Sequence, residues 1–200
     1  MEKKKNDFIA QGSILAIASI LVRVMGMIYR IPMTAIIGDK GNGFYSYAYS
    51  VYTILLLLSS YSLPLAVSKM VSAKAQLGQW RNVKRVFICA IAFAIGIGTT
   101  FGLIVLIGAQ FFTRVFFHSE LAAIALRFMA PTILIMALLG VFRGFFQGLQ
   151  NTLPTAVSQI VEGLINAIMS VVFAYFLFDF GHGMDAAGGT TDLGYAWGAA

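Results

Sequence analysis

Two arginines, Arg23 and Arg30, stand inside an apolar run that begins near Phe8 and ends near Ile37. They are seven positions apart, so in a helix they share one face about 10 Å apart along the axis, and Ser19 falls on the same stripe. Each charge costs about 2.5–3.5 kcal/mol at the centre of a bilayer, so the pair costs about 5–7 kcal/mol. Guanidinium groups bind phosphate oxygens in a forked geometry. The pattern therefore predicts a water-accessible cavity that receives an anion, for which a pyrophosphate is suitable.

A second polar stripe occurs in the apolar segment 153–178. At the spacing of one helix face, this stripe contains Gln159, Glu162, Asn166 and Ser170. An ionisable residue inside a membrane helix is a candidate for function by default. Glu162 would neutralise an arginine, carry a coupling proton or help to bind a cation. The alternative is a purely structural ion pair between Glu162 and one of the two arginines, or snorkelling of Arg30 to the headgroups.

The candidate site residues come from these two segments. Glu162 is assigned to ion coupling or charge balance, with a cation as a candidate coupling partner. No catalytic group, metal site or cofactor site is predicted, because the acidic residues are scattered and Cys89 is the only cysteine. The residues assigned to substrate binding are Arg23, Arg30, Ser19, Gln159 and Asn166.

The amino-acid composition indicates the class of protein in which these residues lie. Of the 200 residues, 59% are hydrophobic and 11% are charged, and the mean hydropathy is +0.83. Soluble domains are about 45–50% apolar and about 25% charged. The chain is therefore predicted to be a polytopic membrane protein. The net charge of +6 is explained by basic cytoplasmic loops, so nucleic acid is not expected as a partner.

A transmembrane helix needs about 20 mostly apolar residues, and five segments meet that length. A sixth begins near Leu193. The prediction is an all-α transmembrane helix bundle that forms the N-terminal part of a longer protein. The five segments are 8–37, 44–67, 84–112, 121–146 and 153–178.

The charges between these segments predict an orientation. Cytoplasmic loops carry an excess of lysine and arginine. Two basic residues, Lys40 and Arg114, fall on one side, and the glycine-rich loop 179–192 on that side has no lysine or arginine. Nine basic residues fall on the other side, with Arg143 counted as following the fourth helix: Lys3, Lys4, Lys5, Lys69, Lys74, Arg81, Lys84, Arg85 and Arg143. A cytoplasmic N-terminus is therefore predicted.

Two further patterns have a structural and a functional interpretation. Four tyrosines open the second segment, where they form an aromatic belt at the membrane interface or stack against sugars. Glycines recur every fourth residue in the fourth segment, which favours close packing of helices. These residues are Tyr45, Tyr47, Tyr49 and Tyr52, and Gly140, Gly144 and Gly148.

Three stretches carry a resemblance to a known family. They are RVMGMIYRIPMTAIIGDKGNGFYSYAYSVYTILL from Arg23, LPLAVSKMVS from Leu63, and FRGFFQGLQNTLPTAVSQIVE from Phe142. The chain resembles the polysaccharide-transport branch of the multidrug/oligosaccharidyl-lipid/polysaccharide (MOP) flippase superfamily, especially the stage V sporulation protein B group, which is similar to the lipid II flippases. The resemblance implies a transporter of 12 to 14 helices in two six-helix lobes around a cavity. The chain would then be most of the N-terminal lobe, with the C-terminal lobe missing and the sixth helix cut off.

The resemblance also implies a cargo, an undecaprenyl-pyrophosphate-linked saccharide such as lipid II, moved across the bacterial cytoplasmic membrane by alternating access. Arg23 matches the first-helix arginine of that family's cavity. No bond is broken in such transport, so an enzyme is not expected. Three alternatives remain. A cation-coupled multidrug exporter of the same superfamily would favour an acidic cavity, and a membrane-embedded glycosyltransferase or polymerase would need a carboxylate cluster or metal site. A non-transporting assembly scaffold would tolerate the loss of both arginines.

Overall fold

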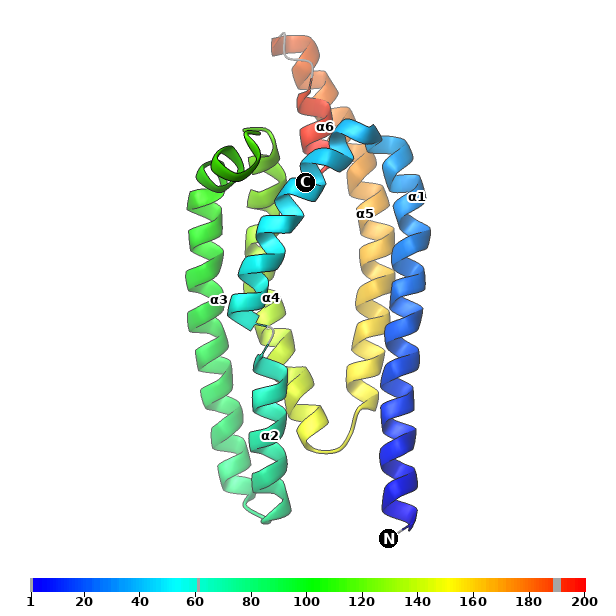
Figure 1. The fold of residues 1–200 in the computed structure, drawn as a ribbon, viewed down its shortest axis with the longest axis vertical. Helices are drawn as coiled ribbons and strands as arrows, with labels where there is room; N and C mark the ends of the chain where they lie inside the picture. Colours follow the sequence, from blue (N-terminus) through cyan, green and yellow to red (C-terminus); the bar gives the residue numbers. More distant parts are fainter. Residues whose placement is uncertain (1, 61, 189–191) are drawn as a thin grey trace.

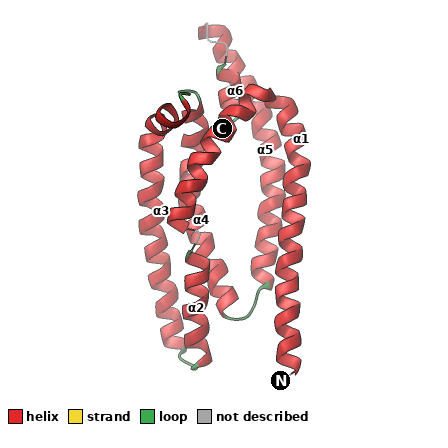
Figure 2. Cartoon of the chain, viewed as in Figure 1, coloured by secondary structure: helices red, strands yellow, loops and turns green. Residues whose placement is uncertain are grey.

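The computed structural model describes residues 2–60, 62–188 and 192–200, with side chains for 12–59, 62–183 and 192–200. Within these ranges the chain consists of helices and short links, with no strand (Figure 2). The predicted all-α class is confirmed. The side chains of Lys3, Lys4, Lys5 and Asp185, which entered the orientation argument, lie outside the described part, as do residues 189–191 of the predicted loop.

Six helices follow one another within the described ranges: α1 (Glu2–Ser60), α2 (Leu63–Gln76), α3 (Trp80–Phe117), α4 (Ala122–Gly148), α5 (Leu153–Gly188) and α6 (Leu193–Gly198). The segments predicted over 84–112 and 121–146 correspond to α3 and α4. The segment predicted over 153–178 continues as α5 as far as Gly188, so most of the predicted loop 179–192 is helical.

A kink at Gly38 divides α1 into two parts. A straight helix of 59 residues would be about 90 Å long, three times the roughly 30 Å of the hydrocarbon core. Gly38 has φ 63° and ψ −174°, a conformation that glycine adopts at little cost because it has no Cβ. Figure 1 shows the first part of α1 beside α5 and the second part crossing toward α3 and α4. The kink thus joins the two sides of the bundle.

The helix predicted over 44–67 is divided in the structure. α1 ends at Ser60, and α2 begins at Leu63 with Pro64 in its first turn. Proline has no N–H group, and its ring clashes with the carbonyl four residues earlier, whereas the first turn of a helix accepts it. Pro64 therefore starts a new helix rather than continuing the old one.

α4 lies at the centre of one half of the bundle. It packs mainly on α3 and α2, and it also contacts α1. A Cβ atom on Gly144 would lie 2.5 Å from the Pro64 carbonyl oxygen, and one on Gly148 would lie 2.8 Å from the Ser68 carbonyl oxygen. For Gly144 and Gly148 the interpretation as packing positions is confirmed, because only glycine lets α2 approach α4 this closely.

The outer surface of the bundle is apolar. Many large hydrophobic side chains are exposed, among them Ile31 at 73% and Ile107 at 79%. Among the described residues, four helical stretches are long and apolar enough to cross a membrane, beginning at Gly12, Trp80, Ala122 and Leu153. These side chains cannot be hidden within the chain, so a bilayer is their natural surrounding, as expected of a multi-pass membrane protein.

The connections gather at two opposite ends of the bundle (Figure 1). The N-terminus, the α2–α3 turn with the basic helix ends that flank it, and the α4–α5 loop lie at one end. The kink of α1, the α3–α4 link and α6 lie at the other, where Lys40 Nζ is 2.9 Å from an Asp192 carboxylate oxygen. The basic segment 68–85 therefore shares an end with the N-terminus, an arrangement on which the predicted orientation depends. This segment consists of the end of α2, the turn 77–79 and the start of α3 rather than a link between helices.

Candidate functional site

The two predicted polar stripes meet in one hollow between α1, α4 and α5. This space, called here the Glu162 hollow, has a volume of about 320 Å³. α1 and α5 are packed side by side along their length, with Gly163 against Val22, so residues from both stripes line the same space. The lining residues are Ser19, Val22, Arg23, Arg143, Gln159, Glu162, Gly163 and Asn166.

Glu162 pairs with an arginine that the sequence did not assign to the site. Arg143 Nη2 donates a hydrogen bond to a Glu162 carboxylate oxygen at 2.5 Å, and Arg143 Nε donates to Ser158 Oγ at 3.1 Å. The Arg143 side chain is only 17% exposed, whereas that of Glu162 is 41% exposed. Glu162 therefore neutralises Arg143 and leaves part of its carboxylate open to the hollow.

The position of Arg143 changes the count of basic residues that supports the predicted orientation. Arg143 was counted as following the fourth helix, but it lies inside α4 and faces α5. The orientation argument therefore loses one of its nine basic residues. A usable signal was present in the sequence, since Arg143 falls within the predicted span 121–146, where a charge needs a partner or a cavity.

Arg23 and Arg30 have no carboxylate partner among the residues that the structure describes. The structural pair between Glu162 and either of them, considered from the sequence, is not formed. Arg23 lines the Glu162 hollow and also a second hollow, which Arg30 lines as well. Three arginines and one carboxylate thus line these two neighbouring hollows, which leaves two positive charges without a counter-charge. An anion is the ligand that such a region favours.

The uncharged site residues provide hydrogen-bonding groups around these charges. Gln159 has a buried side-chain oxygen without a hydrogen-bond partner, although buried polar atoms are nearly always paired. Asn166 Oδ1 accepts a hydrogen bond from Ser170 Oγ at 3.1 Å, and Ser19 Oγ donates to the Leu15 carbonyl at 2.9 Å. The Gln159 amide is therefore the uncharged group best placed to bind a polar ligand.

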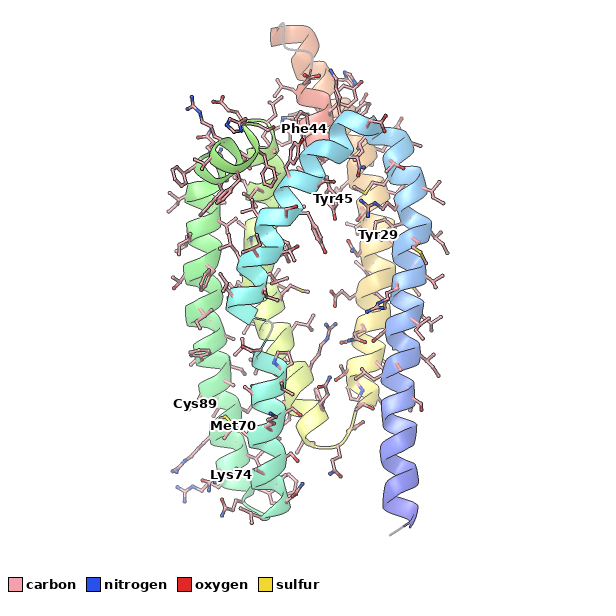
Figure 3. The ribbon with its side chains drawn as sticks, in the orientation of Figure 1. Tyr29, Phe44, Tyr45, Met70, Lys74 and Cys89 are labelled. Atoms are coloured by element: carbon pink, nitrogen blue, oxygen red, sulfur yellow. The ribbon has the colours of Figure 1, made fainter. Side chains whose placement is uncertain are left out.

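The second hollow, called here the tyrosine hollow, has a volume of about 630 Å³. It lies between the two parts of α1 and is lined by Arg23, Gly26, Met27, Tyr29, Arg30, Met33, Tyr45, Ser46, Tyr49 and Ser50. Figure 3 shows Tyr29 and Tyr45 on the two facing parts of α1. Sequence reasoning assigned none of its tyrosines and serines to the site, because only the kink at Gly38 brings residues 45–50 opposite the arginine stripe.

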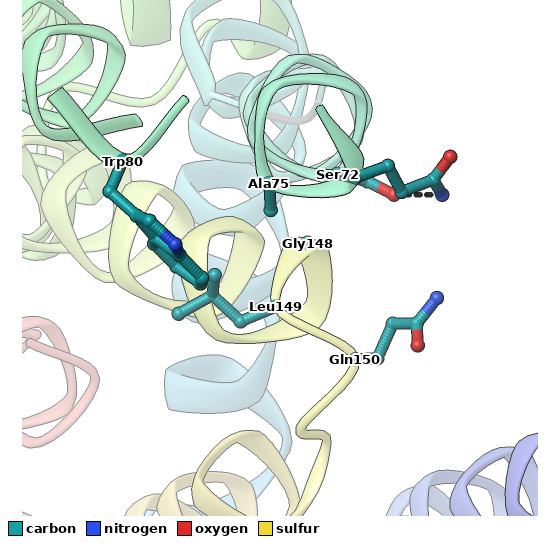
Figure 4. Close-up of a pocket in the computed structure, with 7 residues that line it drawn as sticks. Ser72, Ala75, Trp80, Gly148, Leu149 and Gln150 are labelled. Atoms are coloured by element: carbon teal, nitrogen blue, oxygen red, sulfur yellow. Dashed lines mark hydrogen bonds between the residues drawn. The ribbon is translucent and has the colours of Figure 1, made fainter. Parts of the chain in front are cut away.

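A third hollow, of about 580 Å³, lies at the end of α2 and α4 beside the α2–α3 turn (Figure 4). Ser72, Gln76, Trp80 and Gln150 supply its polar groups, and Ser72 Oγ accepts a hydrogen bond from the Gln76 amide at 3.3 Å. No charged residue is among those that line it, so it is not part of the cationic site. Over the described part of the chain there is also no cluster of three or more potential metal-ligating residues.

Fold and site together define a class of protein: a multi-pass helical membrane protein with a cationic cavity between its helices. The sequence pattern of the polysaccharide biosynthesis protein family matches residues 8–184, and the chain belongs to that family. The predicted membership of the MOP flippase superfamily, in its branch that resembles stage V sporulation protein B and the lipid II flippases, is confirmed.

Three proteins of Bacillus subtilis (strain 168) are similar to the chain. The lipid II flippase MurJ is 27% identical over 78% of this chain and 30% of its own length. Stage V sporulation protein B is 26% identical over 92% of this chain and 36% of its own length. The uncharacterized membrane protein YabM is 26% identical over 95% of this chain and 35% of its own length. The chain thus spans about a third of the length of these relatives, and no solved structure matches it significantly.

Proposed function

We propose that the chain is part of a flippase that moves an undecaprenyl-pyrophosphate-linked saccharide from the cytoplasmic to the outer leaflet of the bacterial membrane. Its relatives include a lipid II flippase and a sporulation protein, so lipid II and related cell-wall precursors are the cargo class. One observation carries the proposal: Arg23 lines two hollows, one shared with Arg30 and the other with Arg143 and Glu162.

The charge of the site matches this cargo. Arg23, Arg30 and Arg143 carry three positive charges and Glu162 one negative charge, so two positive charges remain. A pyrophosphate that links a lipid to a sugar carries two negative charges near neutral pH. Forked hydrogen bonds from guanidinium groups fix such a group in orientation as well as in position. A cationic drug would meet repulsion in the same site, which disfavours the multidrug alternative.

Glu162 has a defined role in this proposal. Without cargo it compensates Arg143, whose largely buried side chain is stabilised by a counter-charge. When a pyrophosphate enters, its oxygens compete with the carboxylate for the guanidinium group. The partly released carboxylate then becomes the group that takes up a proton or a coupling cation.

Transport follows from opening the cavity first on one side and then on the other. The N-terminus and the basic segment 68–85, which comprises the end of α2, the turn 77–79 and the start of α3, are assigned to the cytoplasmic side, where the headgroup enters while its lipid tail stays in the bilayer. The kink at Gly38 is the natural bending point, because helix ends and glycines absorb changes of backbone angle during such motions. No covalent bond changes, and the proposed cycle needs no enzymatic group.

The test uses the full-length protein in cells depleted of their own lipid II flippase. We expect Arg23→Ala to abolish the appearance of labelled lipid II on the outer leaflet, because it removes the charge common to both hollows. Arg127→Ala is the matched control, since Arg127 is an exposed arginine of α4 that lines neither hollow. Wild-type transport by a well-inserted Arg23→Ala variant would refute the proposed site.

A further inference from the structure

We infer that Tyr45 and Tyr49 form a stacking platform for a sugar ring of the cargo, beside the arginines that hold its pyrophosphate. This inference rests on the proposed function and adds a separate subsite for the glycan. It starts from the tyrosine hollow, where two arginines, three tyrosines and two serines share one space. Cationic groups and aromatic rings side by side match a ligand with a phosphate at one end and a pyranose ring at the other.

The four tyrosines of this segment separate into two kinds. Tyr47 stacks on Phe117 with ring centroids 4.7 Å apart, and Tyr52 is buried with its hydroxyl 3.2 Å from Thr132 Oγ1. Neither of these two lines the tyrosine hollow, whereas Tyr45 and Tyr49 do. A simple aromatic belt does not account for rings that line a cavity with arginines.

The two rings stack on each other, so a sugar is expected to lie against the outer face of this pair. The ring centroids of Tyr45 and Tyr49 are 5.6 Å apart, and the ring planes are inclined by 15°. Tyr49 is 47% exposed, so its ring is accessible to a ligand in the hollow. One face of a pyranose ring consists of C–H groups with partial positive charge, which are attracted to the negative face of an aromatic ring.

Serine hydroxyls beside the platform suit the remaining groups of a sugar. Ser46 Oγ donates to the Asn42 carbonyl at 2.7 Å, and Ser50 Oγ donates to the Ser46 carbonyl at 2.8 Å. Because each hydroxyl hydrogen is already used, the oxygen lone pairs are left to accept hydrogen bonds from a ligand. Sugar hydroxyls are donors of that kind, whereas phosphate oxygens at neutral pH are not.

The proposed sugar subsite lies next to the proposed pyrophosphate site, as the covalent structure of the cargo requires. In a polyprenyl-pyrophosphate-linked saccharide the first sugar is attached directly to the second phosphate. Arg30 lines the tyrosine hollow together with Tyr45 and Tyr49, and Arg23 lines both this hollow and the Glu162 hollow. A pyrophosphate held between Arg23 and Arg30 therefore has its first sugar within the same hollow as the two rings.

The experiment compares two lipids, one with a sugar on the second phosphate and one without, whose second phosphate therefore carries an additional ionisable group. The effect of each substitution is read within each lipid, as the variant against the wild type. Binding of undecaprenyl pyrophosphate and of undecaprenyl-pyrophosphoryl N-acetylglucosamine is measured with the purified full-length protein in nanodiscs. We expect Tyr49→Ala to weaken binding of the glycosylated lipid about fivefold and to leave undecaprenyl pyrophosphate binding unchanged, which is the size of one aromatic contact. Tyr49→Phe keeps the ring and is expected to bind both lipids like the wild type.

Controls separate this subsite from its surroundings. Tyr45 also packs against buried core residues, so Tyr45→Ala removes a core contact together with the stacking surface. Tyr45→Phe keeps the ring and is therefore measured beside it as a folding control. Tyr47→Ala is the matched control outside the hollow and is expected to bind both lipids normally. The sugar platform would be overturned if Tyr49→Ala bound the glycosylated lipid as tightly as the wild type does. It would also be overturned if Tyr49→Ala lost the same affinity for both lipids. Unchanged binding of both lipids by Arg23→Ala would instead overturn the proposed function.

Discussion

Replacing Glu162 with glutamine removes the only carboxylate that lines the Glu162 hollow and keeps the size of the side chain. We expect this change to tighten the binding of undecaprenyl pyrophosphate. The carboxylate repels a bound phosphate, and it also occupies Arg143, which lines the same hollow. Both effects oppose the anion in the wild-type protein, and both disappear in Glu162→Gln.

The size of the effect follows from the electrostatics of a partly open site. Two unit charges about 8 Å apart interact by about 2 kcal/mol at an effective dielectric constant of 20, and by about 0.5 kcal/mol in bulk water. Glu162 is 41% exposed, so its environment lies between these limits. The dissociation constant should therefore fall between about twofold and thirtyfold. Tighter binding of the resting complex should also slow release on the outer side.

The same substitution has a cost in stability that must be measured beside binding. Breaking a fully buried ion pair costs about 3–5 kcal/mol, and an exposed pair contributes less than about 1 kcal/mol. The Arg143–Glu162 pair is intermediate, and Arg143 keeps its hydrogen bond to Ser158. We expect the free energy of unfolding to fall by about 1–2 kcal/mol, which leaves a folded protein for the binding assay.

The assay titrates fluorescent undecaprenyl pyrophosphate into the full-length protein in nanodiscs, with wild type beside Glu162→Gln. Glu120→Gln is the matched control, because Glu120 is 70% exposed at the α3–α4 link and pairs with Arg114 away from the hollow. An unchanged or larger dissociation constant for a folded Glu162→Gln protein would refute the electrostatic argument. A change of the same size in Glu120→Gln would show that total charge, and not this site, determines binding.

Two further predictions concern the helices that hold the site. Gly144→Ala places a Cβ against the backbone of α2 and should lower the free energy of unfolding by about 1–3 kcal/mol, measured by thermal denaturation in detergent. Gly96→Ala has nothing within 4 Å of the new Cβ and should be neutral or slightly stabilising; equal loss in both variants would contradict the packing argument. Gly38→Ala forces a residue with a Cβ into φ 63° and should cost about 1–2 kcal/mol. Transport should fall with it, and a variant with wild-type stability and transport would show that the kink does not need glycine.

Much of the fold could be predicted from local sequence alone. Hydropathy and length identified the apolar helices, because a membrane helix satisfies its backbone hydrogen bonds internally and needs no distant partner. The break before Pro64 and the helical continuation of α5 past 178 were missed. The break before Pro64 comes from the steric clash of a proline ring with the preceding helical turn, which hydropathy does not record. The continuation of α5 occurs in a polar stretch, where hydropathy gives no helix signal.

The sequence predicted several residues that line the candidate site but not which of them form ion pairs with one another. Helical spacing placed Ser19, Arg23 and Arg30 on one face, and the same rule grouped the polar residues of α5. Spacing along one helix carries no information about which helix lies opposite. For that reason Glu162 was considered as a partner of Arg23 or Arg30, although its partner is Arg143 of α4.

By itself the sequence determined that this is a helical membrane protein with two polar stripes, because hydropathy and periodicity depend on residues close together in the chain. Only the tertiary structure decided that the stripes share a hollow, that Glu162 pairs with Arg143, and that Tyr45 and Tyr49 lie beside the arginines. These outcomes depend on the kink at Gly38 and on the contact of α1 with α5, which fix the relative position and rotation of whole helices. That information resides in packing between distant segments, and no local pattern records it.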